Sequence, residues 1–308
     1  MSPLRTKDLV SLKDLSGEEI LHILDLAATM KANPDHYSDT LAGQTLAMIF
    51  EKPSLRTRVT FETGMTQLGG HAIYLAPSDA QIGKRESVPD VARNLERWVD
   101  GVMARTFSHR TVADLAAYAS IPVINGLSDF SHPCQGLADY LTLREVKGEL
   151  KGRTLAYVGD GNNVVHSLLF GGAKIGVHVR VATPKGYEPL AEVVEAASRE
   201  AAGSGGSVRL FSDPREAVQG ADAVYTDVWA SMGQESETEA RRAIFKPYQV
   251  NGDLMAAAGE DAVFLHCLPA HRGDEVTDEV ADSPSSVIFQ QAENRLHAQK
   301  AVLAVLMG

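Results

Sequence analysis

Hydroxyl and guanidinium groups gather directly after a short apolar run near the start of the chain. Ser54-Leu55-Arg56-Thr57-Arg58 follows the strand-like residues 45–50. Ser54 is a typical N-cap, so we expect a helix to begin here and to present free backbone N–H groups beside the arginines. This combination favours a phosphate or another anion. The alternative is an ordinary capped helix with surface arginines.

Arg105 also follows a strand-like run, at residues 101–104. Taken alone, an arginine in this place fits a surface salt bridge. Convergence of Arg56, Arg58 and Arg105 on one sheet edge would instead favour the binding of a dianion.

His132 and Gln135 stand three residues apart around Pro133, which suits the first position of a helix. A neutral histidine beside a glutamine amide can hold a carbonyl oxygen through N–H donors. The alternative is a histidine that caps its own helix.

A carboxylate and a thiol follow two later strand-like runs. Asp227 comes after 223–225 and could hold a substrate ammonium group. Cys267 comes after 262–266; it could be a nucleophile, although no hydrolase elbow accompanies it, or a small buried hydrophobe. Neither of the two cysteines belongs to a C-x-x-C pair, so we expect no metal site.

Gly159-Asp160-Gly161-Asn162-Asn163-Val164 resembles the start of a dinucleotide fingerprint. Val164 stands where the third glycine belongs, and the strand-like run at 179–184 lacks the acid that binds a ribose. The chain also lacks the G-x-x-x-x-G-K-[ST] motif. We therefore expect a Rossmann-like turn without a nucleotide cofactor.

The elements that must position these residues alternate between strand-like and helical patterns. A capping box at 16–19 starts the first helix, and Asn33-Pro34 ends it. Helices are also predicted at 56–68, 88–99, 111–118, 133–146 and 293–306, and a loop at 201–207. The predicted strands are 45–50, 101–104, 121–124, 154–158, 177–182, 207–211, 223–225, 262–266 and 286–289.

This alternation predicts an α/β protein of two doubly wound, parallel-sheet, Rossmann-like domains. A polar, glycine-containing break at 147–152 marks the boundary. We expect one domain at 1–147, joined by the C-terminal helix 290–308, and another at 148–289. Ligands of parallel sheets bind beyond the carboxyl ends of the strands, so the reactive segments suggest one cleft between two facing sheet edges.

Composition narrows the class of protein. The chain has 308 residues with a formal net charge of −11, which argues against nucleic acid and anionic membranes as partners. Two cysteines cannot form a disulfide framework, and the N-terminus lacks the apolar core of a signal peptide. No apolar run is long enough to span a membrane. We therefore expect a cytoplasmic protein.

Five separated segments together resemble the ornithine carbamoyltransferases of the aspartate/ornithine carbamoyltransferase superfamily. They occur in the order SLRTR at 54–58, HPCQGLAD at 132–139, GDGNN at 159–163, DVWASMG at 227–233 and HCLP at 266–269. The resemblance covers essentially the full length. It implies transfer of the carbamoyl group of carbamoyl phosphate to ornithine, within arginine and ornithine metabolism, by a homotrimer that needs no cofactor and closes on binding.

The resemblance also implies roles for individual residues. Cys267, Asp227, His132 and Arg105 correspond to catalytic positions. Ornithine-binding positions correspond to Asn163, Asp227, Ser231 and Met232. Carbamoyl-phosphate positions correspond to Ser54, Leu55, Arg56, Thr57, Arg58, Gln81, Arg105, His132, Gln135, Cys267, Leu268 and Arg295, with Gln81 reaching a neighbouring subunit's site.

Two departures and two alternatives accompany the resemblance. Leu55 replaces a threonine common in the family, and Lys84-Arg85 replaces a basic residue followed by glycine. The acceptor could instead be putrescine, acetylornithine or aspartate, although DVWASMG and HCLP favour ornithine. A catalytically silent binding paralogue should have lost the phosphate arginines or Cys267, and all of them are present.

Overall fold

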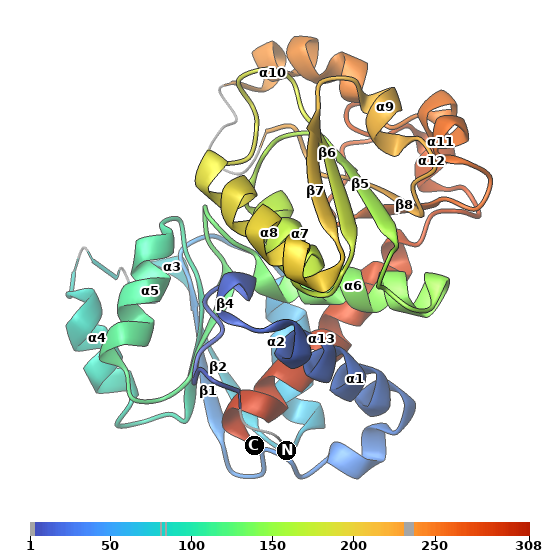
Figure 1. The fold of residues 1–308 in the computed structure, drawn as a ribbon. Coiled ribbons are helices and arrows are strands. Elements are labelled where there is room, and N and C mark those ends of the chain that lie inside the picture. Colours follow the sequence, from blue (N-terminus) through green and yellow to red (C-terminus); the bar gives the residue numbers. More distant parts are fainter. Residues whose placement is uncertain (1–3, 81, 84, 231–236) are drawn as a thin grey trace. The chain divides into compact units, whose positions relative to one another are not determined.

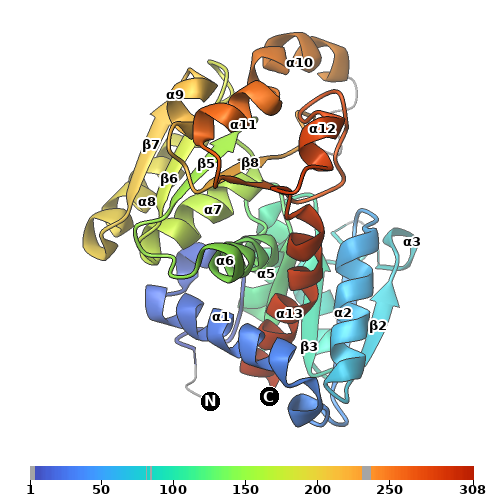
Figure 2. The same cartoon turned by 90° about the vertical axis from the view of Figure 1, so that its right-hand side faces the viewer.

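The computed structural model describes residues 4–80, 82–83, 85–230 and 237–308. Its contacts divide the chain into two compact units, Met1–Leu141 with Glu293–Gly308, and Thr142–Ala292. Each unit is a parallel sheet with helices on both faces, so the prediction of two doubly wound α/β units is confirmed (Figures 1 and 2). The chain passes between the units within α6 (Pro133–Lys147) and α13 (Ile288–Met307).

The first unit has four strands in the order β2 (His71–Leu75), β1 (Thr45–Phe50), β3 (Gly101–Arg105) and β4 (Val123–Leu127). All of these pairs are parallel, and Phe50 at the end of β1 lies opposite Arg105 at the end of β3. The segments after these two central strands therefore leave the sheet at the same edge.

Helices cover both faces of this sheet. On one face, α4 (Val88–Leu95) and α5 (His109–Tyr118) pack against the alternate residues of β1 and β3 through a cluster that includes Ala92, Leu115 and Ile49. Figure 2 shows α1 (Gly17–Ala32), α2 (Leu55–Gln67) and α13 on the other face. The shorter helices of this unit are Leu12–Asp14, Pro34–Tyr37 and Pro77–Ala80 (α3).

The second unit has five parallel strands in the order β7 (Ser207–Phe211), β6 (His178–Ala182), β5 (Thr154–Val158), β8 (Ala223–Thr226) and β9 (Val263–His266). The chain runs outward from β5 to β7 and then returns to β8. The edge between β5 and β8 is therefore the topological switch point, where ligands bind in sheets of this kind.

Two layers of helices flank this second sheet (Figure 1). One face carries α7 (Asn163–Lys174) and α8 (Ala191–Ser204). The opposite face packs against α9 (Pro214–Val218), α11 (Gly252–Ala258) and α12 (Asp278–Ala281) through a buried hydrophobic cluster. The remaining helices are α10 (Thr238–Phe245) and the single turn Lys246–Tyr248. In the part of the chain that is described, no helix is both long and apolar enough to cross a membrane.

Most predicted elements appear close to their expected bounds, but the predicted strand at 286–289 is wrong. Only Ser286 forms an isolated bridge, to Phe264, and α13 already begins at Ile288. The apolar residues there start a helix, and Phe289 is 70% exposed. The predicted loop at 201–207 is wrong over its first half, because α8 continues to Ser204 and ends at Gly205, which has a φ of +88°.

The other differences are smaller. The predicted helix at 88–99 ends at Leu95, because the next backbone N–H groups turn back onto the carbonyls of Asn94 and Leu95. Strand β2 was not predicted; it lies at the edge of its sheet, and its side chains are exposed or half-buried, so it lacks the apolar signal of the central strands.

Candidate active site

Thr57 is the meeting point of two buried arginines in the first unit. Ser54 caps α2 by accepting from the backbone N–H of Thr57, as predicted. Nη2 of Arg295 donates to Oγ1 of Thr57 at 3.1 Å, and Nη1 of Arg105 lies 3.5 Å from the same oxygen. Arg295 and Arg105 are only 3% and 8% exposed, respectively. The N-terminus of α2 thus lies beside two buried cationic side chains.

Gln135 extends this cluster along α6. Its Oε1 accepts from Nη1 of Arg295 at 2.7 Å, and its Nε2 donates to Oδ1 of Asp139, also at 2.7 Å. The glutamine amide is therefore locked in one orientation between a donor and an acceptor. The structure brings together Thr57, Arg105, Gln135 and Arg295, which the sequence places far apart.

His132 lies buried at the start of α6. Burial lowers the pKa of its imidazole well below the usual range, and the charges of Arg295, Arg105 and Lys52 lower it further. His132 is therefore neutral at physiological pH and can donate one N–H to an oxygen without carrying a charge.

Lys52 is a buried cation that the sequence analysis did not single out. It follows β1 directly, its Nζ lies 4.8 Å from the centre of the Phe107 ring, and it is 9% exposed. Burial lowers the pKa of its ammonium group, and the nearby Arg105 charge acts in the same direction. The available signal was its position after the same strand that precedes Ser54.

Arg58 and Leu55 lie elsewhere on α2. Arg58 pairs with Glu62 at 2.9 Å, and its guanidinium stacks 3.7 Å from the centre of the Tyr74 ring. Leu55 is 76% exposed, and Arg56 is half-buried. Arg105 shares the Thr57 hydroxyl with Arg295, whereas Arg58 contacts Glu62 and Tyr74.

In the second unit, Asp227 and Cys267 follow neighbouring strands and contact each other. The Cys267 thiol donates to Oδ1 of Asp227 at 2.9 Å, and the backbone N–H of Val228 donates to the same oxygen at 2.8 Å. The other oxygen, Oδ2, accepts from Nδ2 of Asn162 at 2.7 Å. A carboxylate beside a thiol can hold an ammonium group and orient an amine.

The G-x-G turn serves backbone packing at this edge. A Cβ on Gly161 would come within 2.3 Å of the backbone at Glu188 and Pro189, and the Gly161 N–H donates to the carbonyl of Tyr187. Gly161 is therefore required because the backbone at Glu188 and Pro189 leaves no room for a side chain. Asn163 is the first residue of α7.

A buried histidine–carboxylate pair shapes the turn that contains Cys267. Nε2 of His266 lies 3.0 Å from Oε1 of Glu275, and its Nδ1 accepts from the backbone N–H of Leu268 at 2.9 Å. Both side chains are fully buried. Leu268 has a φ of +58°, a left-handed conformation that is uncommon for a leucine and is held here by this hydrogen bond.

Ligand atoms of Asp227, His266 and Cys267 lie within 4.8 Å of one another, so we tested whether they suit a metal ion. Both ring nitrogens of His266 already have partners, in Glu275 and Leu268. Binding a metal would require His266 to give up one of these hydrogen bonds. These contacts indicate that His266 supports the turn and is not arranged to bind a metal ion.

Asp160 and Arg241 form a further pair that the sequence analysis missed. Nη1 of Arg241 lies 3.2 Å from Oδ2 of Asp160 and donates to the carbonyl of Trp229 at 2.9 Å. Burial raises the pKa of the Asp160 carboxyl to about 6, against the lowering effect of Arg241. The partners are about eighty positions apart in the chain, so no local pattern could reveal them.

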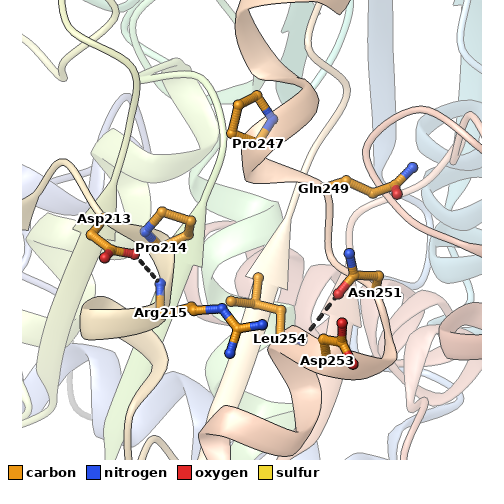
Figure 3. A pocket seen from close by; sticks show the side chains of 8 residues that line it. All are labelled: Asp213, Pro214, Arg215, Pro247, Gln249, Asn251, Asp253 and Leu254. Atoms are coloured by element: carbon orange, nitrogen blue, oxygen red, sulfur yellow. Dashed lines mark hydrogen bonds between the residues drawn. The ribbon is translucent and has the colours of Figure 1, made fainter.

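Three predicted positions, Gln81, Ser231 and Met232, lie outside the described residues. A separate hollow of about 250 Å³ in the second unit lies between α9 and α11 (Figure 3). Its lining includes Asp213, Arg215 and Asn251, and none of the predicted site residues lines it.

Comparison with known proteins agrees with this geometry. The carbamoyl-P binding domain of the aspartate/ornithine carbamoyltransferases matches residues 7–145, and the Asp/Orn binding domain of that family matches residues 151–306. The second match includes most of α13, whereas contacts group residues from Glu293 onward with the first unit.

Full-length relatives carry the same family name. The ornithine carbamoyltransferase of Pyrococcus abyssi is 58% identical over 310 residues, covering 99% of this chain and 97% of the relative. That of Bacillus subtilis is 56% identical, covering 98% and 94%. The solved ornithine carbamoyltransferase of Pyrococcus furiosus is 59% identical with a TM-score of 0.95, covering 98% and 97%. These matches confirm the resemblance seen in the sequence, and the chain belongs to the aspartate/ornithine carbamoyltransferase family.

Proposed function

We propose that this protein transfers the carbamoyl group of carbamoyl phosphate to the δ-amine of L-ornithine, giving L-citrulline and phosphate. The observation that carries the proposal is the buried pair Arg105 and Arg295 around Thr57 at the N-terminus of α2. Two buried guanidiniums beside a helix N-terminus suit a phosphate dianion. The relatives that match over nearly their full length are ornithine carbamoyltransferases, and this supports ornithine as the acceptor.

Each domain has its own substrate in this proposal. Residues 1–147, joined by the C-terminal helix 290–308, bind carbamoyl phosphate, and residues 148–289 bind ornithine. The descriptions of the two matching family domains support one substrate for each domain. The contacts of Arg295 on α13 with Thr57 and Gln135 support the assignment of that helix to the first domain.

The phosphate of carbamoyl phosphate binds to the N-terminus of α2, Thr57, Arg56 and Arg105. Arg295 and neutral His132 hold the carbamoyl oxygen, where negative charge builds up in the tetrahedral intermediate. The depressed pKa of His132 supports this role, because a neutral imidazole donates an N–H without repelling the cations around it. The full set is Ser54, Leu55, Arg56, Thr57, Arg58, Gln81, Arg105, His132, Gln135, Cys267, Leu268 and Arg295.

Ornithine binds through Asn163, Asp227, Ser231 and Met232. Asp227 holds the α-ammonium group, and Cys267 orients the δ-amine. The 2.9 Å contact between the thiol and the carboxylate supports a shared role at the amine substrate. The thiol acts here as an orienting group, and the reaction requires no covalent intermediate on it.

The reaction proceeds through the neutral amine. The δ-amine attacks the carbamoyl carbon, the oxyanion forms, and the C–O bond to phosphate breaks. An alkylamine has a pKa of about 10.4 in water, so only a small fraction is neutral at pH 7. The rate is therefore expected to rise with pH until the bound amine is deprotonated.

The protein works as a homotrimer in the cytoplasm in this proposal, and Gln81 reaches the site of a neighbouring subunit. The family resemblance supports the trimer, and the composition supports the location. Light scattering on the purified protein should give three times the chain mass of 33.1 kDa. A monomer with full activity would contradict the role of Gln81.

Product stoichiometry tests the proposed reaction. Carbamoyl phosphate and ornithine should yield citrulline and phosphate in a ratio of one to one, measured by colour reaction and by phosphate assay. Phosphate release without citrulline would indicate hydrolysis and would contradict the proposal.

A further inference from the structure

Asn162 makes two different kinds of hydrogen bond with its side-chain amide. Oδ1 accepts from the backbone N–H groups of Val164 at 2.9 Å and Val165 at 3.3 Å, which caps α7. Nδ2 donates to Oδ2 of Asp227 at 2.7 Å. A rotated amide would turn its N–H groups toward the two helix donors, so these contacts define which atom faces the carboxylate.

Asp227 is held at both of its carboxylate oxygens as a result. Oδ2 accepts a hydrogen bond from the Asn162 amide, while Oδ1 accepts from the Cys267 thiol and from the backbone N–H of Val228. The side chain is 6% exposed, and the Tyr157 hydroxyl lies 3.5 Å from Oδ1 of Asn162. A carboxylate fixed by several donors has its orientation set before any ligand arrives.

We propose that Asn162 is a positioning residue that orients Asp227 toward the amino group of ornithine. The inference rests on the proposed function, because it assumes that Asp227 binds ornithine. It assigns to Asn162 a role beyond that of its neighbour Asn163, which is expected to contact the substrate. Because one side chain makes both contacts, Asn162 fixes the carboxylate of Asp227 relative to the start of α7.

A helix cap alone is the competing explanation, and the chain offers a matched control for it. Asn251 is the N-cap of α11, and its Oδ1 accepts from the backbone N–H of Leu254 at 3.0 Å. Figure 3 shows this bond at the hollow lined by Asp213 and Asn251. Equivalent substitutions at Asn162 and Asn251 therefore alter the same kind of cap within one unit.

Asn162→Ser and Asn162→Asp keep an oxygen that can cap α7 but lose the amide donor to Asp227. We expect the KM for ornithine to rise at least tenfold in Asn162→Ser and further in Asn162→Asp, where a second carboxylate faces Asp227. The KM for carbamoyl phosphate should stay within twofold, and the melting temperature within about 2 °C. Asn251→Ser and Asn251→Asp should leave both KM values within twofold.

An unchanged KM for ornithine in a folded Asn162→Ser variant would overturn the proposal. So would a rise of both KM values together with a fall in melting temperature, because that pattern indicates a cap only. An equal rise in the KM for ornithine in Asn251→Ser would contradict it as well.

A second readout needs no carbamoyl transfer. An added carboxylate near Asp227 disfavours the Cys267 thiolate, so alkylation of Cys267 by iodoacetamide should slow at least threefold in Asn162→Asp and not in Asn251→Asp. A wild-type protein that makes no citrulline would refute the proposed function. Slower alkylation in Asn162→Asp would then still support the contact of residue 162 with the Asp227–Cys267 pair, and equal alkylation rates would refute that contact as well.

Discussion

The candidate sites of the two units occupy the same place in similar folds but carry opposite charge. Both lie at the carboxyl edge of a parallel sheet. The first gathers buried cations, Lys52, Arg105 and Arg295, whereas the second gathers the carboxylates Asp160 and Asp227 with a thiol. The fold thus determines where ligands bind, and the side chains after each strand determine the charge of the ligand.

The two sites also differ in how their charges are supported. Arg105 and Arg295 both contact the hydroxyl oxygen of Thr57, and Arg295 also contacts the amide oxygen of Gln135. In the second unit, Asp160 faces the cation of Arg241. The first site therefore concentrates positive charge in a protein whose net charge is −11.

The largest effect is expected from removing a cation of the first site. Arg105→Ala should raise the KM for carbamoyl phosphate about 100-fold or more, because loss of a buried charged contact costs at least about 2–3 kcal/mol. The KM for ornithine should change little. Arg110→Ala is the control, because that side chain is 86% exposed. A carbamoyl-phosphate KM that stays within twofold in Arg105→Ala would contradict the cationic site.

The converse change in the second site should affect the other substrate. Cys267→Ser should raise the KM for ornithine about tenfold, about 1.4 kcal/mol, and leave the KM for carbamoyl phosphate nearly intact. Cys134 gives the control for chemical labelling, since burial raises the pKa of its thiol to about 12 and keeps it protonated. Iodoacetamide should therefore modify Cys267 first and abolish ornithine use. A carbamoyl adduct trapped on Cys267 would refute its role as an orienting group.

His132 predicts a pH dependence of stability. Its pKa is lower in the folded protein than in the unfolded chain, so below about pH 6.5 the unfolded chain binds a proton that the native state does not. Stability should fall as the pH drops through this range, by up to about 1.4 kcal/mol per pH unit. His132→Gln should reduce that slope in urea unfolding. An unchanged slope in His132→Gln would mean that His132 is protonated in the native protein.

Asp160 predicts a smaller effect of opposite sign. Its pKa of about 6 in the folded protein lies above the unfolded value of about 3.9, so the native state takes up a proton first as the pH falls. This uptake adds up to about 1 kcal/mol of stability between pH 7 and pH 5. Asp160→Asn should remove the gain, measured as a steeper loss of stability over that range. The same pH dependence in both proteins would contradict a raised pKa at Asp160.

Local sequence patterns predicted those helices and strands that a short, characteristic signal marks. The cap at Ser54, the helix start at Pro133 and the buried strand at 45–50 all follow from short-range rules. The edge strand β2 and the start of α13 do not follow these rules. The residues of β2 lack the apolar run of a buried strand, and the apolar residues at the start of α13 resemble a strand.

Contacts between distant segments were the part that the sequence could not supply. The pairs Asp160–Arg241 and His266–Glu275, and the amide of Asn162 on Asp227, depend on how strands and helices are arranged in space. Asp227, Cys267 and Arg105 nevertheless lie at sheet edges as predicted, since parallel strands bring their carboxyl ends together.

The choice of acceptor tests the account most directly. Carbamoyl phosphate should be offered with ornithine, putrescine, acetylornithine and aspartate in separate reactions, and the carbamoylated product measured in each. The account predicts rapid formation of citrulline from ornithine and at least a hundredfold slower reaction with the other three. Comparable or faster carbamoylation of aspartate, or no product from ornithine, would contradict it.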